Sequence, residues 1–344
     1  MNVGTFADVQ AAMKRNGTRA FSLLLGNGFS MSYAPDIFSY NALHGFVERI
    51  DSPLLQALFR VVDTHDFERV MQQLETFAAL GDILGIDDGL KQRIKGASGD
   101  LKRSLIDAIR ALHPEHVYTI PEERCAACAS FLRPFLTSGG ALFTTNYDLL
   151  LYWVLMRARL PSIDGFGRDR ESPDEYVPED ELEYSELRWG RNLDGQNVHY
   201  VHGALPLFDT GVEIVKEQYS EEYLLEQIAK RIERGELPVF VTAGDAVQKR
   251  THIRHNPYLE HSYEALAAVD GSLVTLGFNF GQQDVHIVDA LKRATKNGQK
   301  VPPRLWSLYI GVFSESDIVR AAELADDLKC KVHVFDSRTA HVWE

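Results

Sequence analysis

The chain has 344 residues, enough for one large domain or two ordinary ones, and its apolar and charged fractions of 45% and 25% are typical of globular proteins. Its net charge of −13 argues against a whole-protein affinity for nucleic acid or anionic membranes. No apolar run approaches the roughly 20 residues of a membrane span, and residues 1–16 lack the apolar core of a secretory signal. Three cysteines cannot form a disulfide framework, so we expect a cytoplasmic protein.

The first predicted strand, residues 21–25, follows a short amphipathic helix over 5–15 and ends in the glycine loop Gly26-Asn27-Gly28-Phe29-Ser30. Two glycines separated by one residue let the backbone turn sharply and approach a ligand where a Cβ would collide. A helix that begins soon after Ser30 would direct its free N–H groups at a phosphate. The loop predicts a dinucleotide site, although the third glycine of the full fingerprint is missing. A tight turn without a ligand is the alternative.

Residues 41–136 are predicted to form a helical insertion after this first βα unit. Apolar residues recur at helix spacing without strand-like alternation, as in Leu101, Leu105, Ile106 and Ile109. We expect the loop of the insertion between Gly81 and Gly99. A later stretch, 160–197, is rich in acidic residues and is predicted to be a solvated surface loop.

The rest of the chain alternates strands and helices. We predict strands at 141–145, 198–202, 238–242, 273–277, 305–310 and 331–335, and helices at 149–158, 220–234, 258–268, 284–296 and 315–329. Alternation with nearly continuous apolar strands is typical of a parallel sheet covered by helices. The fold class is therefore α/β, a Rossmann-like doubly wound parallel sheet with a helical insertion, organised as a single domain over 1–344.

Polar residues and glycines gather where four of these strands end. Ligands of open parallel sheets bind beyond the carboxyl ends of the strands, so we expect a pocket there. The strand ends carry Gly26-Asn27-Gly28, Asn146-Tyr147-Asp148, His202-Gly203 and Gly277-Phe278-Asn279-Phe280, the last followed by Asp284. Structural roles remain open, because a histidine before glycine often packs and Asp148 suits a helix cap.

Taken in order, these motifs resemble the SIR2 (sirtuin) superfamily. Its G-A-G-[IF]-S, P-D-F-R, T-Q-N-[IY]-D and H-G motifs correspond to Gly26 to Ser30, Pro35-Asp36, Thr144 to Asp148 and His202-Gly203, and the turn at Gly277 takes the place of its adenosine-ribose loop. The closer resemblance is to bacterial SIR2-like proteins of the NAD-hydrolase, anti-phage defence type. It covers nearly the whole chain, including Tyr200 to Leu205, Val241 to Gly244 and Asn256 to Leu259.

The resemblance implies NAD as the substrate and assigns a role to each matched residue. Asn146 would fix a water or a ribose hydroxyl beside C1′, Asp148 would accept a hydrogen bond from the nicotinamide carboxamide, and His202 would be the general base. Nicotinamide leaves as a neutral molecule, so no general acid is required. The implied cofactor-binding residues are Gly26, Asn27, Gly28, Phe29, Ser30, Asp36, Thr144, Gly203, Gly277, Asn279 and Asp284.

Two departures from the protein-deacylating sirtuins matter. Those enzymes hold zinc with two C-x-x-C pairs, whereas this chain has only Cys125-Ala126-Ala127-Cys128, in an Ala-rich helical segment. We interpret the pair as packing and expect no zinc site. The arginine of P-D-F-R is also missing, because Ile37 follows Asp36. Both losses favour water as the acceptor.

The predicted function is therefore NAD hydrolysis to nicotinamide and ADP-ribose in anti-phage defence. Because a free NAD hydrolase would be toxic, we expect control by a homo-oligomer or by a partner of the ATPase, helicase or Argonaute type. The alternatives are an NAD-dependent deacylase or ADP-ribosyltransferase, and a non-catalytic NAD or ADP-ribose sensor. No direct nucleic-acid binding is expected. The basic segment Lys249 to His255 is either a solvated loop or a phosphate contact.

Overall fold

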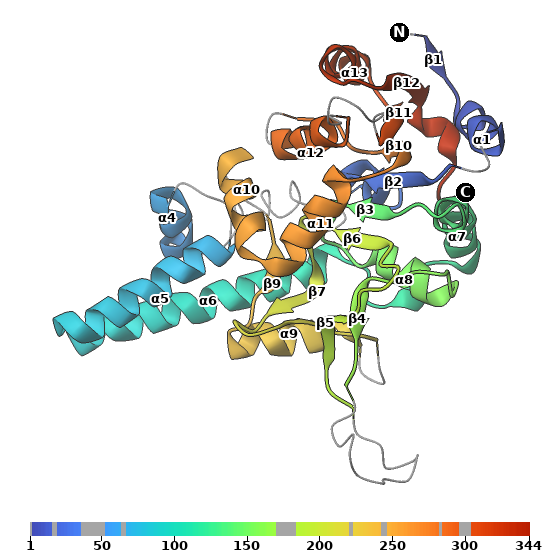
Figure 1. The fold of residues 1–344 in the computed structure, drawn as a ribbon. Coiled ribbons are helices and arrows are strands. Elements are labelled where there is room, and N and C mark those ends of the chain that lie inside the picture. Colours follow the sequence, from blue (N-terminus) through green and yellow to red (C-terminus); the bar gives the residue numbers. More distant parts are fainter. Residues whose placement is uncertain are drawn as a thin grey trace, which may run out of the picture.

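The computed structural model describes residues 2–15, 19–35, 52–62, 67–169, 184–219, 223–241, 246–281, 284–295 and 304–344 (Figure 1). Its centre is a seven-stranded parallel sheet in the order β1-β12-β11-β10-β2-β3-β6. The strands are β1 (Val3–Gly4), β2 (Phe21–Leu25), β3 (Leu142–Thr144), β6 (Val198–Tyr200), β10 (Gly271–Leu276), β11 (Leu305–Val312) and β12 (Lys331–Asp336). Every pair in this sheet is parallel, as predicted; β1 was not predicted.

The strand order is that of a Rossmann fold. Read from the β6 edge, the sheet runs β6-β3-β2-β10-β11-β12, which is the 3-2-1-4-5-6 order, with β1 added at the far edge. The chain therefore changes direction of growth between β2 and β10, two strands whose residues are all buried. This topology confirms the predicted fold class.

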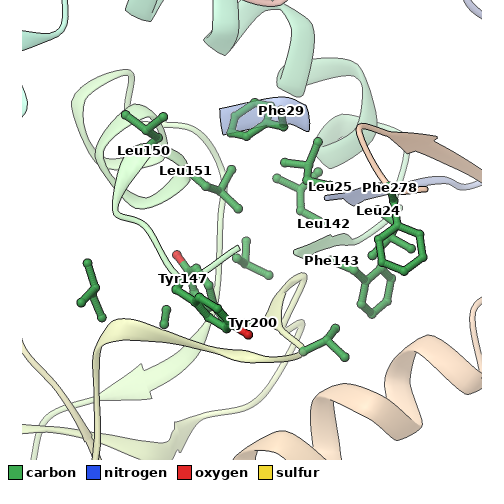
Figure 2. Packing of buried hydrophobic residues seen from close by; sticks show 14 of the residues in the cluster. Leu24, Leu25, Phe29, Leu142, Phe143, Tyr147, Leu150, Leu151, Tyr200 and Phe278 are labelled. Atoms are coloured by element: carbon green, nitrogen blue, oxygen red, sulfur yellow. The ribbon is translucent and has the colours of Figure 1, made fainter. Parts of the chain in front are cut away.

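Helices cover both faces of the sheet. In Figure 1, α12 and α13 lie on one side and α1 and α7 on the other. The helices around this sheet are α1 (Phe6–Arg15), α7 (Glu122–Thr137), α8 (Leu150–Arg157), α11 (Pro257–Ala267), α12 (Val285–Thr295) and α13 (Glu315–Asp327). Figure 2 shows the core near the carboxyl ends of β2, β3 and β6, where Phe29, Tyr147 and Phe278, which follow β2, β3 and β10, are buried beside strand residues. These segments are thus anchored in the core.

The predicted helical insertion is confirmed in the residues described. It contains α4 (Pro53–Val62), α5 (Phe67–Leu84), α6 (Asp88–Leu112) and the short 3-10 helix η1 (Val117–Thr119), and α5 and α6 project together from the body (Figure 1). The expected loop between Gly81 and Gly99 is wrong. The connection spans only 85–87, and Asp87 caps α6 by accepting a hydrogen bond from Leu90 N at 2.9 Å. Glycine costs a helix only about 1 kcal/mol, so capping and packing override it.

A second sheet, which the sequence did not predict, has five antiparallel strands in the order β4-β5-β8-β7-β9. They are β4 (Gly165–Gly167), β5 (Leu187–Asn192), β8 (Ile214–Lys216), β7 (Gly203–Asp209) and β9 (Pro238–Phe240). The predicted strand 238–242 therefore belongs to this sheet rather than the parallel one, and 160–197 is not simply a loop. Strands of three residues, such as β4 and β8, are too short to show the alternation or the apolar run by which a strand is recognised.

One buried arginine ties this sheet to its covering helix α9 (Leu224–Arg234). Arg231 is 7% exposed and forms ion pairs with Glu186, Glu217 and Glu236. Glu186 belongs to the acidic stretch 160–197, so at least this acid pairs with a buried cation, although its own side chain is 56% exposed. The basic segment 249–255 was considered as a loop in the sequence, but it lies within the helix α10 (Ala246–His255).

Candidate functional site

Two glycine-containing loops meet at the switch point between β2 and β10. Gly28 N donates to Gly277 O at 2.9 Å, and Gly26 N donates to Leu276 O at 2.9 Å. A Cβ on Gly28 would lie 2.6 Å from Gly277 Cα, and Gly277 itself has φ +68°. These glycines are therefore required for the contact between the two loops. Phe280, at φ +52°, adds a left-handed residue to the second loop.

The helix after β2 begins earlier than predicted. It is α2 (Asn27–Met31), which starts inside the glycine loop and ends near the residue where the helix was expected to begin. The C-terminal segment covers it: Trp343 Nε1 donates to Phe29 O at 3.0 Å, and the rings of Trp343 and Phe29 lie 5.1 Å apart. The first loop is thus held on one side by β10 and on the other by the end of the chain.

Ser30 connects the first loop to the loop after β3. Its Oγ donates to Asp148 Oδ2 at 2.6 Å and accepts from Asn146 Nδ2 at 2.8 Å, while Asn146 Nδ2 also donates to Gly26 O at 3.0 Å. Asp148 Oδ1 accepts from Leu150 N, the first residue of α8, although the N-cap position of this helix is Leu149 rather than Asp148. Burial raises the pKa of Asp148 to about 6, although the hydrogen bonds from Ser30 and Leu150 oppose this. We call Ser30, Asn146 and Asp148 the serine network.

His202, beyond the end of β6, belongs to a second group. Its Nε2 lies 2.8 Å from Nε2 of His286 in α12, and Asp284 Oδ1 accepts from Lys249 Nζ at 3.0 Å. Within the described chain, ligand atoms of His202, Asp284 and His286 all lie within 4.8 Å of one another. We call these three residues the histidine cluster.

Both imidazoles of the cluster are held neutral. Burial, together with His286 and Lys249 nearby, keeps the pKa of His202 well below its ordinary value of 6.5. Burial also lowers the pKa of His286 to about 4, an effect that Asp284 opposes. In a neutral pair, one ring nitrogen donates the shared hydrogen bond and the other accepts it.

A family model described as a domain of unknown function, DUF4917, matches residues 23–343. The chain belongs to the DUF4917 family. The matched span begins inside β2 and ends at Trp343, so it includes both loops, the serine network and the histidine cluster. No match is found among curated proteins.

The predicted site residues of this DUF4917 chain divide between these groups. Asn146 and Asp148 join Ser30, whereas His202 and Asp284 join the histidine cluster. Gly203 (φ +79°) packs against the backbone of β9, where a Cβ would lie 1.9 Å from Val239 O. This contact is sufficient to require glycine at position 203. Thr144 is buried and its Oγ1 accepts from Asn146 N at 3.0 Å. The remaining members are Gly26, Asn27, Gly28, Phe29 and Gly277 in or against the first loop, Asn279 at an exposed position, and Asp36, which lies outside the described residues.

Three residues beside the site were missed in the sequence, and Lys249 was noted only as part of the basic segment. Lys249 and His286 complete the surroundings of His202, and Trp343 covers the first loop. His113 accepts from Leu149 N at 2.9 Å through Nε2 and so joins the helical insertion to the loop after β3. The Asp284-Val285-His286 spacing was the one available signal, because it places two metal-ligand types two residues apart.

Cys125 and Cys128 lie on the buried side of α7, which fits their interpretation as packing residues. Burial raises the pKa of both thiols, that of Cys128 well above 9.0. Finally, no helix in the described ranges is long and apolar enough to cross a membrane.

Proposed function

We propose that this DUF4917 protein is a SIR2-like NAD hydrolase that cleaves the nicotinamide–ribose bond to give nicotinamide and ADP-ribose. The observation that carries the proposal is the Rossmann strand order with two glycine loops in contact at its switch point. Dinucleotides bind in this crevice in sheets of this order. Of the motifs that resemble the SIR2 superfamily, those at Gly26 to Ser30, Thr144 to Asp148 and His202-Gly203 follow strands at the same carboxyl edge.

The serine network supports a role in holding the ribose. The amide nitrogen of Asn146 is committed to Gly26 O and Ser30 Oγ, so its Oδ1 is the atom left to accept a bond from a ribose hydroxyl or a water. Ser30 fixes the orientation of that amide. Asp148 is held behind it, where its carboxylate polarises the Ser30 hydroxyl.

The histidine pair supports proton transfer. A neutral imidazole can take a proton from water as the water attacks C1′, while nicotinamide leaves with the bonding electrons of the glycosidic bond. A hydrogen-bonded partner can share the incoming proton, which offsets the low basicity that burial gives His202. The proton of the attacking water thus goes to the imidazole and the bonding electrons go to nicotinamide, so no general acid is needed.

A second candidate, a non-catalytic NAD or ADP-ribose sensor, is favoured by the hydrogen bonds that the proposed catalytic residues already make within the protein. The Nε2 atom of His202 is already engaged by His286, and Asp148 accepts internal bonds through both oxygens. A pure binding module uses buried polar groups in this way to hold loops.

The proposal also includes a cytoplasmic location and control by self-assembly or a defence partner, both of which follow from the resemblance.

Incubation of the protein with NAD, with and without an acetylated peptide, separates these candidates. We expect nicotinamide and ADP-ribose at a rate that the peptide does not change. His202→Ala should lower that rate by about 10²–10⁴-fold, whereas His333→Ala, at an exposed position of β12, should leave it unchanged. Calorimetric NAD binding without turnover in the wild type would support the sensor. Release of nicotinamide that depends on the peptide would support the deacylase.

A further inference from the structure

The histidine cluster has the composition of a metal site. His202 follows β6, Asp284 precedes α12 and His286 lies in its first turn, so two separate segments bring two imidazoles and a carboxylate together. Imidazole and carboxylate ligands together suit Zn²⁺ and related first-row ions. We propose that His202, Asp284 and His286 form a binding site for one divalent transition-metal ion.

The distances fit an ion with modest side-chain movement. Two ligand atoms that each lie about 2.1 Å from an ion are separated by roughly 3.0 Å at a right angle and by at most about 4.2 Å. The two Nε2 atoms are 2.8 Å apart, and the three ligand atoms all lie within 4.8 Å. Small rotations of Asp284 and the two rings therefore complete a three-ligand face, and the open positions remain for water.

His286, a member of the cluster, carries a buried polar atom that bears on the proposal. His286 is 1% exposed, and within the described chain its Nδ1 has no hydrogen-bond partner. An unsatisfied buried nitrogen costs free energy, and an ion bound through Nδ1 would remove that cost, whereas an ion bound through Nε2 would leave it. The hydrogen bond to His202 engages one nitrogen only.

Lys249 makes this site an exchangeable one. Its ammonium group occupies the position of a cation beside Asp284, at 3.0 Å from Oδ1, and the Lys249 side chain is 6% exposed. An incoming ion must displace that ammonium, so Lys249 lowers the metal affinity and neutralises Asp284 when no ion is bound. In the proposed hydrolase, an ion on His202 would occupy the base and inhibit turnover. This regulatory consequence rests on the proposed function, whereas metal binding does not.

The test is titration of the chelator-treated full chain with Zn²⁺ and, for spectroscopy, Co²⁺. We expect one ion per chain by calorimetry and by elemental analysis after dialysis, and a Co²⁺ absorption spectrum without thiolate charge-transfer bands. His286→Ala and Asp284→Asn should each weaken binding at least tenfold. Lys249→Met should strengthen it, the opposite direction to any general loss of structure.

Two controls test whether the ion binds elsewhere on the chain. Cys125→Ser combined with Cys128→Ser removes the cysteine pair, and His255→Ala removes an exposed histidine on α10; neither change should alter the stoichiometry. Circular dichroism establishes that each variant is folded. Unchanged affinity in folded His286→Ala and Asp284→Asn, or loss of binding in the cysteine variant, overturns the proposal. Metal binding without NAD turnover overturns only the hydrolase.

Discussion

Ser30 Oγ donates a hydrogen bond of 2.6 Å to Asp148 Oδ2 between positions 118 residues apart, and the same hydroxyl accepts from Asn146. Ser30 is completely buried. It therefore serves as the link between the loop after β2 and the loop after β3. Ser30, which the resemblance implies as a cofactor-binding residue, thus also positions two residues implied to act on NAD.

Ser30→Ala should destabilise the fold by about 1–3 kcal/mol, because Asp148 and one Asn146 proton lose a buried partner. It should also raise the pKa of Asp148 further, since the Ser30 hydrogen bond lowers it. Denaturant unfolding at several pH values measures both effects. Ser130→Ala, at an exposed position of α7, is the matched control and should stay within about 0.5 kcal/mol. Equal effects of the two variants would contradict the structural role of Ser30.

Gly277→Ala should disrupt the contact between the two loops. Its Cβ would lie 2.4 Å from Phe29 N, in addition to the strain of an alanine at φ +68°. Gly139→Ala is the matched control, because Gly139 has φ +76° but nothing within 4 Å of the added Cβ. The control should cost about 1–2 kcal/mol for the left-handed conformation alone. Gly277→Ala should cost clearly more in chemical denaturation and, under the proposed function, should weaken NAD binding in calorimetry.

Protonation of His113 in mild acid should lower the free energy of unfolding. Burial lowers its pKa to about 4 in the folded chain, against 6.5 for an ordinary histidine. The unfolded chain therefore binds the proton first. The stabilisation is fully present above pH 6.5 and is lost as the pH falls toward 4, by up to about 3 kcal/mol.

The measurement is the slope of unfolding free energy against pH. His113→Gln should flatten it between pH 6.5 and 4, although it should also lower stability at neutral pH by removing the ring that packs on Trp153. His255→Gln serves as the control at an exposed position. An unaltered slope in the His113 variant would show that protonation elsewhere dominates.

Arg231→Ala should be among the most destabilising single changes in the second sheet. It would leave three carboxylates without the cation that they share; because their side chains are 20–56% exposed, the cost should lie below the about 3–5 kcal/mol of breaking a fully buried pair. Arg231→Lys should recover part of the loss, because lysine keeps the charge but not the planar donors. Arg234→Ala, one turn away and exposed on α9, is the control. Thermal unfolding with little difference between Arg231→Ala and Arg234→Ala would contradict this role.

The sequence by itself determined the parallel sheet and the helical insertion. Strands such as 21–25 are buried on both faces, so the whole segment must be apolar, and a local pattern suffices to recognise it. The insertion was recognised because helix spacing repeats over many turns. The location of the candidate site at the carboxyl edge of the sheet followed from the fold class, since all parallel strands end at the same edge.

Only the tertiary structure decided which of these residues meet. The pairing of β7 with β9, the contact of Gly28 with Gly277 and the bond between His202 and His286 join segments that are remote in sequence. No local periodicity carries that information. The sequence alone does not distinguish a glycine required for loop packing from a glycine that lets a phosphate approach the backbone. The partner of a histidine is not visible in the sequence either, because the fold brings the two residues together and excludes water from around them.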